Sequence, residues 1–306
     1  MADRSNKMVA KKISKKKLKI IIFGGSGFLG SHVAEALHAQ DHKVIIADIK
    51  KPIDIKKNIK FKKVDIKNEK KILNLTKNVD VVYNFAAIAD IQESYDDPIK
   101  TFKINIIGSA YILKSCVANR VKKYILASSI YADSSQGGFY RVSKQSCELM
   151  TAEYGKVFNL NFTILRFGSI YGPRSNLNNG LLKIVYDAIK KKKIVYRGTS
   201  KAVRSYIHVV DAAKASADIL KNRFNNKVVL IKGRKSVKIK KLLNDLRQIT
   251  KIKSSPIFLN KTQKGHYDRK PRPLKKTKSI NFFRSDTLDF KKGLLELIRI
   301  IKSKKF

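Results

Sequence analysis

A glycine-rich turn between an apolar run and a predicted helix constrains the fold of this chain most. The segment Lys19–Phe23 reads KIIIF, as expected for a strand buried on both faces of a parallel sheet. The sequence GGSGFLG follows at residues 24–30. Gly24 permits a tight turn, Gly27 lets the backbone approach a pyrophosphate, and Gly30 lets the next helix pack close to the sheet. Because a helix N-terminus attracts phosphate, the strand, turn and helix together predict a dinucleotide-binding site.

Strands and helices alternate through the rest of the first half of the chain. This rhythm predicts an α/β fold of the Rossmann type, a doubly wound parallel sheet with helices on both faces and a smaller C-terminal substrate-binding lobe. The predicted strands are 44–47, 59–64, 79–85, 123–127 and 161–167, and the predicted helices are 31–39, 69–76, 98–119 and 140–158.

The rhythm changes after Gly172, where turn residues become frequent. Here the sequence predicts a helix over 180–191, a strand over 228–231, a helix capped by Ser236 that runs to Thr250, a loop over 262–280 and a last helix over 289–301. The expected domains are a disordered basic tail over 1–17, a cofactor-binding domain over 18–172 to which 203–232 returns, and a lobe mainly formed by 173–306.

The chain is strongly basic, with 67 Lys and Arg against 23 Asp and Glu, a formal charge of +44. Such a charge attracts polyanions and concentrates phosphorylated substrates. The lysines are spread along the chain without an aromatic-interleaved basic motif, so we do not favour a specific nucleic-acid partner. The two cysteines show no pairing pattern, and no apolar run reaches the roughly 18 residues of a membrane span. We therefore expect a cytoplasmic protein.

No metal site is expected, because His32, His208 and His266 lack a second ligand at useful spacing. Asp48 lies 18 residues after Gly30, at the end of the second predicted strand. A carboxylate at this point accepts hydrogen bonds from the ribose and repels a 2′-phosphate, which favours NAD over NADP.

Tyr140 and Lys144 are four residues apart on a predicted helix, so they share one face. A neighbouring ammonium and a cationic nicotinamide both favour the phenolate, so we expect the Tyr140 pKa to be lowered towards neutrality. Ser129 lies at the end of the predicted strand upstream, and it can hydrogen-bond the same substrate hydroxyl that Tyr140 contacts. The three residues predict an acid–base site, although a Tyr-x-x-x-Lys pair alone also occurs as a surface helix pair.

Taken together, these motifs resemble the extended short-chain dehydrogenase/reductase family, in its NAD-dependent epimerase/dehydratase branch. The resemblance runs from about Ile20 to Leu297. It rests on GGSGFLG, Asp48, Val64-Asp65-Ile66, Asn84-Phe85-Ala86-Ala87, Asn105-Ile106-Ile107-Gly108, Ser128-Ser129, Tyr140 with Lys144, Leu165-Arg166-Phe167-Gly168-Ser169-Ile170-Tyr171-Gly172-Pro173-Arg174 and Val203-Arg204-Ser205-Tyr206-Ile207-His208-Val209.

The resemblance implies a role for each matching position. The implied catalytic residues are Ser129, Tyr140 and Lys144. The implied NAD-binding residues are Gly24, Gly27, Phe28, Leu29, Gly30, Asp48, Asp65, Ile66, Ala86, Ala87, Asn105 and Lys144. Ser129, Arg174, Asn179 and Arg204 would bind the substrate, a nucleotide-diphosphate sugar, with Arg204 on the diphosphate. The resemblance also implies a homodimer formed through helices 98–119 and 140–158.

Two departures from the family pattern bear on the reaction. Ile130-Tyr131 follows Ser129 in place of the Asp-Glu pair that eliminates water in 4,6-dehydratases, which disfavours dehydration. Ser205 stands where an Asp usually follows the diphosphate-binding Arg. The favoured hypothesis is a nucleotide-sugar epimerase acting at C4, of the UDP-glucose/UDP-galactose type. A dehydrogenase, reductase or dehydratase of the same family remains an alternative, as does a non-catalytic NAD- or RNA-binding protein.

Overall fold

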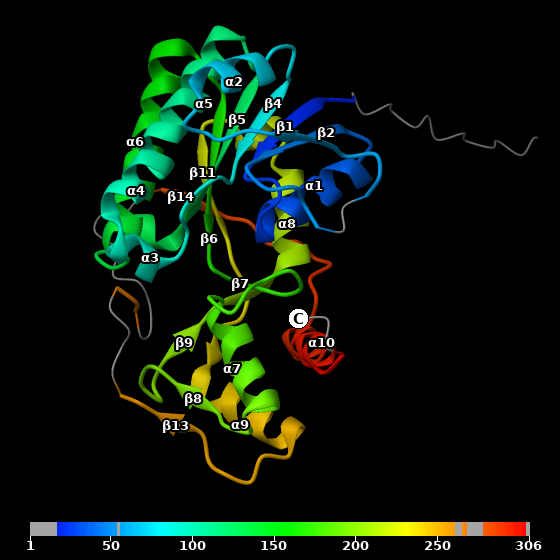
Figure 1. Ribbon diagram of the computed structural model, residues 1–306, viewed down its shortest axis with the longest axis vertical. Helices are drawn as coiled ribbons and strands as arrows, with labels where there is room; N and C mark the ends of the chain where they lie inside the picture. Colours follow the sequence, from blue (N-terminus) through cyan, green and yellow to red (C-terminus); the bar gives the residue numbers. More distant parts are fainter. Residues whose placement is uncertain (1–16, 54–55, 261–264, 268–277, 304–306) are drawn as a thin grey trace, which may run out of the picture.

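The centre of the computed structural model, which describes residues 17–53, 56–260, 265–267 and 278–303, is an eight-stranded sheet (Figure 1). Its strand order is β14-β11-β6-β5-β4-β1-β2-β3, and every neighbouring pair is parallel. These strands are β1 (Lys19–Phe23), β2 (Lys43–Asp48), β3 (Lys60–Lys63), β4 (Val81–Asn84), β5 (Lys123–Ser129), β6 (Phe162–Phe167), β11 (Lys227–Ile231) and β14 (Ser279–Asn281).

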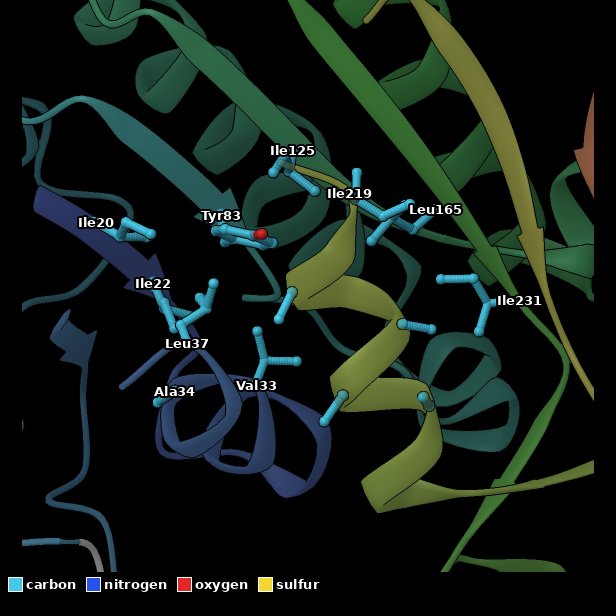
Figure 2. Close-up of a cluster of buried hydrophobic side chains, with 14 of the residues drawn as sticks. Ile20, Ile22, Val33, Ala34, Leu37, Tyr83, Ile125, Leu165, Ile219 and Ile231 are labelled. Carbon is cyan, nitrogen blue, oxygen red and sulfur yellow. The ribbon is translucent and has the colours of Figure 1, made fainter. Parts of the chain in front are cut away.

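Helices cover both faces of the sheet. On one face, α1 (Phe28–Ala39) and α8 (Val209–Asp218) pack together against β1, β4, β5 and β6, as Figure 2 shows. The opposite face carries α2 (Glu69–Leu75), α5 (Gly108–Ala118) and α6 (Gly138–Phe158). The central strands are therefore buried on both sides, which explains why Ile20, Ile21, Ile22 and Phe23 are all apolar.

A smaller lobe lies below the sheet in Figure 1 and has a core of its own. Its helices are α7 (Gly180–Lys190), α9 (Ile239–Thr250) and α10 (Phe290–Lys302). Three two-stranded pairs join or border it, formed by β7 (Ser169–Tyr171) with β10 (Tyr206–His208), β9 (Val203–Arg204) with β12 (Val237–Lys238), and β8 (Val195–Tyr196) with β13 (Ile257–Phe258). The predicted fold class is thus confirmed.

The helix predicted over 98–119 is confirmed as a continuous helical segment made of α4 (Pro98–Phe102), a π-helical turn (Lys103–Ile107) and α5. The π-helical turn was not predicted, nor was α3 (Ile91–Asp96), which precedes the segment. Asp97 separates α3 from α4, because its side chain caps α4 and Pro98 cannot continue α3. The extra residue of the π-turn re-aims the side chains that follow it.

Two predictions need correction. Ser236 does not cap α9, whose N-cap is Lys238; the Ser236 hydroxyl instead lies 3.3 Å from that of Ser205. The loop predicted over 262–280 contains the edge strand β14, while most of its residues lie outside the described part of the chain. The predicted tail over 1–17 also lies outside it, except for Lys17, which pairs with Asp41.

Candidate active site

The glycine turn after β1 has the geometry that its sequence predicts. Gly24 adopts φ +75°, and a Cβ there would lie 2.4 Å from the Ala86 nitrogen. A Cβ on Gly30 would lie 2.3 Å from the Gly24 oxygen. Neither a capping side chain nor an acidic residue covers the first turn of α1, which begins after Gly27. The turn is therefore a backbone cradle at a helix N-terminus, suited to an anion.

Asp48 lies at the end of β2, beside this turn. Its carboxylate accepts hydrogen bonds from the backbone N–H of Ser26 at 3.0 Å and of Lys50 at 3.1 Å. The half-buried Asp65 follows β3 and pairs with Lys67 at 3.4 Å. Next to it, Ile66 is buried against Gly108 of α5, where a Cβ would lie 2.5 Å from the isoleucine. The structure thus places the predicted ribose and adenine residues at one edge of the sheet.

Two buried asparagines hold the loop that follows β4. Asn84 accepts from the Ala86 N–H at 3.2 Å. Asn105, in the π-turn, accepts from the Ile88 N–H at 2.8 Å, and its amide donates to the Ile88 oxygen and to Ser143. Asn105 therefore supports the Ala86-Ala87 loop and α6 through hydrogen bonds to protein groups.

The structure brings Ser129, Tyr140 and Lys144 together at the carboxyl end of β5. Ser129 is the last residue of that strand, and Tyr140 and Lys144 lie on the first two turns of α6. The Tyr140 hydroxyl is hydrogen-bonded to the Ser129 side chain. Lys144 Nζ donates to the Ala127 oxygen at 2.9 Å and lies 5.9 Å from the centre of the Tyr140 ring. All three side chains are buried.

Burial sets the pKa values of this group, which corrects the expectation that Lys144 lowers the Tyr140 pKa. Loss of hydration raises the pKa of Tyr140 to about 12, and the hydrogen bond with Ser129 opposes this rise. Burial also lowers the pKa of Lys144, because its ammonium is removed from water. In the chain by itself, desolvation therefore dominates both pKa values, and Lys144 is not among the groups that lower the pKa of Tyr140.

A buried charged network behind these residues was missed by sequence reasoning. Glu148, one turn beyond Lys144, accepts from Ser128 at 2.5 Å and from two nitrogens of Arg166 at 3.0 and 2.7 Å. Arg166 also pairs with Asp133 at 3.1 Å. Two signals were present in the sequence: the i+4 spacing of Glu148 from Lys144, and a charged residue inside the apolar strand β6.

The three arginine and asparagine positions predicted on the substrate side do not gather in one place. Arg174 pairs with Glu35 of α1 at 2.7 Å. Asn179 caps α7, accepting from Leu182 N–H at 3.2 Å and donating to the Ile170 oxygen at 2.8 Å. Arg204 lies 4.3 Å over the ring of Tyr267.

Contacts of the Arg204 side chain connect it to the group formed by Ser129, Tyr140 and Lys144. The Tyr267 ring beneath it lies 5.5 Å from that of Tyr131, and the Tyr131 N–H donates to Ser129 Oγ at 3.2 Å. Across the described ranges, no three His, Cys, Asp or Glu side chains are grouped as a metal site requires. No helix of that part is both long and apolar enough to cross a bilayer.

Several known proteins are similar to this chain along most of its length. A curated relative from Methanocaldococcus jannaschii, named "Putative UDP-glucose 4-epimerase", is 24% identical, and the alignment covers 93% of this chain and 98% of that protein. The solved structure of UDP-glucose 4-epimerase from Thermotoga maritima with UDP-glucose is similar at a TM-score of 0.80 and 22% identity, covering 94% of this chain and 100% of that one.

A third comparison has the cofactor in place. The structure of UDP-glucuronic acid 4-epimerase from Bacillus cereus, in complex with UDP-glucuronic acid and NAD, matches at a TM-score of 0.81 and 22% identity, covering 94% of this chain and 99% of that one. The sequence profile of the NAD-dependent epimerase/dehydratase family matches residues 20–231, more than half of the chain. The predicted family and the family's cofactor, NAD, are thereby confirmed, and this chain belongs to the NAD-dependent epimerase/dehydratase family.

Proposed function

We propose that this chain is a nucleotide-sugar 4-epimerase that acts on a UDP-sugar, with Tyr140 as its acid–base residue. The grouping of Tyr140 with Ser129 and Lys144 at the end of β5, on the same sheet edge as the glycine turn, carries the proposal. Relatives named as 4-epimerases of UDP-sugars support the choice of substrate and of C4.

The residues at the sheet edge fit NAD. The Gly24 and Gly30 cradle takes the pyrophosphate, with Gly27, Phe28 and Leu29 at the start of α1. The remaining assigned positions are Asp48 for the ribose, Asp65 and Ile66 for the adenine, and Ala86, Ala87 and Lys144 towards the nicotinamide. Bound NAD supplies the group that accepts and returns a hydride.

The chain's own residues then move one proton. Tyr140 takes the proton of the C4 hydroxyl when the hydride leaves C4, and gives it back when the hydride returns to the opposite face. Ser129 hydrogen-bonds the reacting oxygen, and Lys144 anchors the helix that carries Tyr140 to β5. Substrate and product differ only in configuration, so no net oxidation occurs.

Arg204 is assigned to the diphosphate, since its planar fork suits phosphate oxygens. Arg174 and Asn179 are left out of the proposed substrate set, because Glu35 and the first turn of α7 engage their side chains. In this assignment the sheet domain binds NAD, and the lobe formed by α7, α9 and α10 holds the nucleotide.

The test is a panel of UDP-, dTDP-, GDP- and CDP-sugars incubated with the protein and NAD. NMR identifies the sugar, and the nicotinamide absorbance band reports net redox. A changed sugar without net NADH supports the epimerase; net NADH indicates a dehydrogenase instead. Bound NAD with no conversion of any sugar favours the non-catalytic alternative.

Tyr140→Phe isolates the acid–base role in the same assay. We expect this variant to bind NAD while losing turnover by about 100-fold or more. Tyr111→Phe, at a half-buried tyrosine of α5, is the matched control and should retain both properties. Undiminished turnover of Tyr140→Phe would refute the assignment.

A further inference from the structure

A second protic pair lies next to the catalytic group, formed by Tyr131 and His266. The Tyr131 hydroxyl lies 3.2 Å from His266 Nδ1, and the two rings meet edge to face at 6.2 Å. Tyr131 follows Ser129 by two residues and donates its N–H to the Ser129 hydroxyl. His266 comes from 135 residues further along the chain. Sequence reasoning assigned neither residue a role, because Ile130-Tyr131 replaces the Asp-Glu pair of the dehydratases and His266 lacks a second metal ligand at useful spacing.

The backbone around His266 is shaped to reach this place. Gly265 adopts φ +78°, and a Cβ there would lie 2.9 Å from Ile91 of α3. A glycine is therefore needed where the chain passes close over α3. The next residue but one, Tyr267, is buried between the Tyr131 ring at 5.5 Å and the Arg204 guanidinium at 4.3 Å. The contacts of residues 265–267 thus link α3, the end of β5 and β9.

Contacts connect the pair to the two groups that would hold opposite ends of a sugar: Tyr131 meets Tyr267 beneath Arg204, and its N–H donates to Ser129, which is hydrogen-bonded to Tyr140. On one side, Arg204 is assigned to the diphosphate, which is attached at C1. On the other, Tyr140 is assigned to C4. Both act electrostatically on Tyr131: burial raises its pKa most, Tyr267 and Tyr140 add to the rise, and Arg204 opposes it. Burial and Arg204 lower the pKa of His266, so both members are uncharged at neutral pH.

We propose that Tyr131 and His266 form a recognition site for a hydroxyl group of the sugar ring, and that they determine which sugar the protein accepts. The inference rests on the proposed function. When the Tyr131 O–H donates to Nδ1, the imidazole carries its proton on Nε2. The pair then offers one donor, Nε2–H, and one acceptor, the second lone pair of the Tyr131 oxygen, whose first accepts from the backbone N–H of Tyr267. A hydroxyl group, which both donates and accepts, is the complement of that pair.

Binding of UDP and of UDP-glucose to the NAD-loaded protein separates this role from packing. The variants are Tyr131→Phe and His266→Phe, which keep an aromatic ring in each position. Each variant should bind UDP-glucose about tenfold more weakly, which is the effect of one or two lost hydrogen bonds. The affinity for UDP should stay unchanged, because UDP has no sugar attached to the diphosphate. Tyr111→Phe is the control for both ligands.

Deoxy analogues of UDP-glucose then identify the hydroxyl. Wild-type protein should bind the analogue that lacks the recognised hydroxyl about tenfold more weakly than UDP-glucose. Tyr131→Phe should bind that analogue and UDP-glucose with equal affinity. The inference is overturned if the variants lose equal affinity for UDP and for UDP-glucose. It is also overturned if wild-type protein binds the deoxy analogues as tightly as UDP-glucose. If the variants lose affinity for UDP-glucose but not for UDP, and the wild-type protein converts no sugar, the inference holds and the proposed epimerase activity is refuted.

Discussion

Glu148 and Arg166 form a bidentate ion pair, with both side chains buried, behind the end of β5. The carboxylate accepts from Arg166 Nε at 3.0 Å and from Nη2 at 2.7 Å, and it also accepts from Ser128. Glu148 lies on α6 with Tyr140 and Lys144, whereas Arg166 lies on β6 and reaches Asp133 in the turn after Ser129. The pair therefore joins the helix that carries Tyr140 to the strand and turn that carry Ser129.

Glu148→Gln should destabilise the protein strongly. It removes one partner of a buried ion pair and leaves the Arg166 charge without full compensation, which typically costs about 3–5 kcal/mol. Urea unfolding measures this loss. Glu153→Gln on the same helix is the control, because Glu153 is exposed and its pair with Lys156 spans 3.9 Å, so a change below about 1 kcal/mol is expected. Similar losses in the two variants would contradict the role of the pair.

Ser129→Ala should move the activity profile to higher pH. The hydrogen bond from Ser129 opposes the effect of burial on Tyr140, whose pKa is about 12, so its loss raises that pKa further. Less phenolate is then present at any neutral pH, and kcat/KM at pH 7 should fall by about 10- to 100-fold. The measurement is kcat/KM against pH. The control is Ser146→Ala. Ser146 lies on α6, the helix of Tyr140, and its hydroxyl donates to the Val142 oxygen, so this variant should reproduce the wild-type curve.

The grouping of Ser129, Tyr140 and Lys144 could be predicted from the sequence because the signals for it are local. A strand, a turn and an i, i+4 helix pair each occupy a few neighbouring residues, and the parallel sheet brings their ends to one edge. By contrast, His266 meets Tyr131 across 135 residues, through a segment with no periodic pattern. The Tyr140 pKa was also misjudged, since the cost of burial depends on packing around the residue, which spacing along the chain does not reveal.

Gly24→Ala should destabilise the protein and abolish NAD binding. At φ +75° an L residue is strained, and its Cβ would lie 2.4 Å from the Ala86 nitrogen, so the turn has to move; we expect a loss above about 2 kcal/mol. Gly180→Ala is the matched control. Nothing lies within 4 Å of a Cβ at Gly180, which begins α7, so stability should stay level or rise by up to about 1 kcal/mol. Thermal unfolding with and without NAD measures both effects.

Stability should fall as the pH drops below 6.5, in part because of His32. Burial lowers the pKa of this residue from its ordinary 6.5, and its Nε2 lies 3.1 Å from the Pro173 oxygen. Below pH 6.5 the unfolded chain binds a proton that the folded chain resists, so the free energy of unfolding decreases until the pH falls through the folded pKa. His32→Gln, measured by urea unfolding from pH 7.5 to 5, should weaken this dependence. His38→Gln, on the same helix, should preserve it.

We propose that the protein forms a homodimer through α5 and α6. Four large apolar side chains of α6 are exposed: Leu149 by 72%, Val157 by 59%, Phe158 by 51% and Phe139 by 37%. Leu149 and Val157 are eight residues apart and so share one face of the helix. Glu153 lies between them, and exposed apolar side chains flanked by charged ones on a surface helix are compatible with a protein–protein contact.

Leu149→Glu should convert a dimer into a monomer at micromolar concentration, because burying an unpaired carboxylate at an interface costs more than such a contact supplies. Sedimentation velocity reports the mass of each form. Leu177→Glu, at a leucine 39% exposed in the segment before α7, introduces the same charge away from α5 and α6 and should leave the dimer intact. A monomeric wild-type protein, or a Leu149→Glu variant that stays dimeric, would exclude this interface.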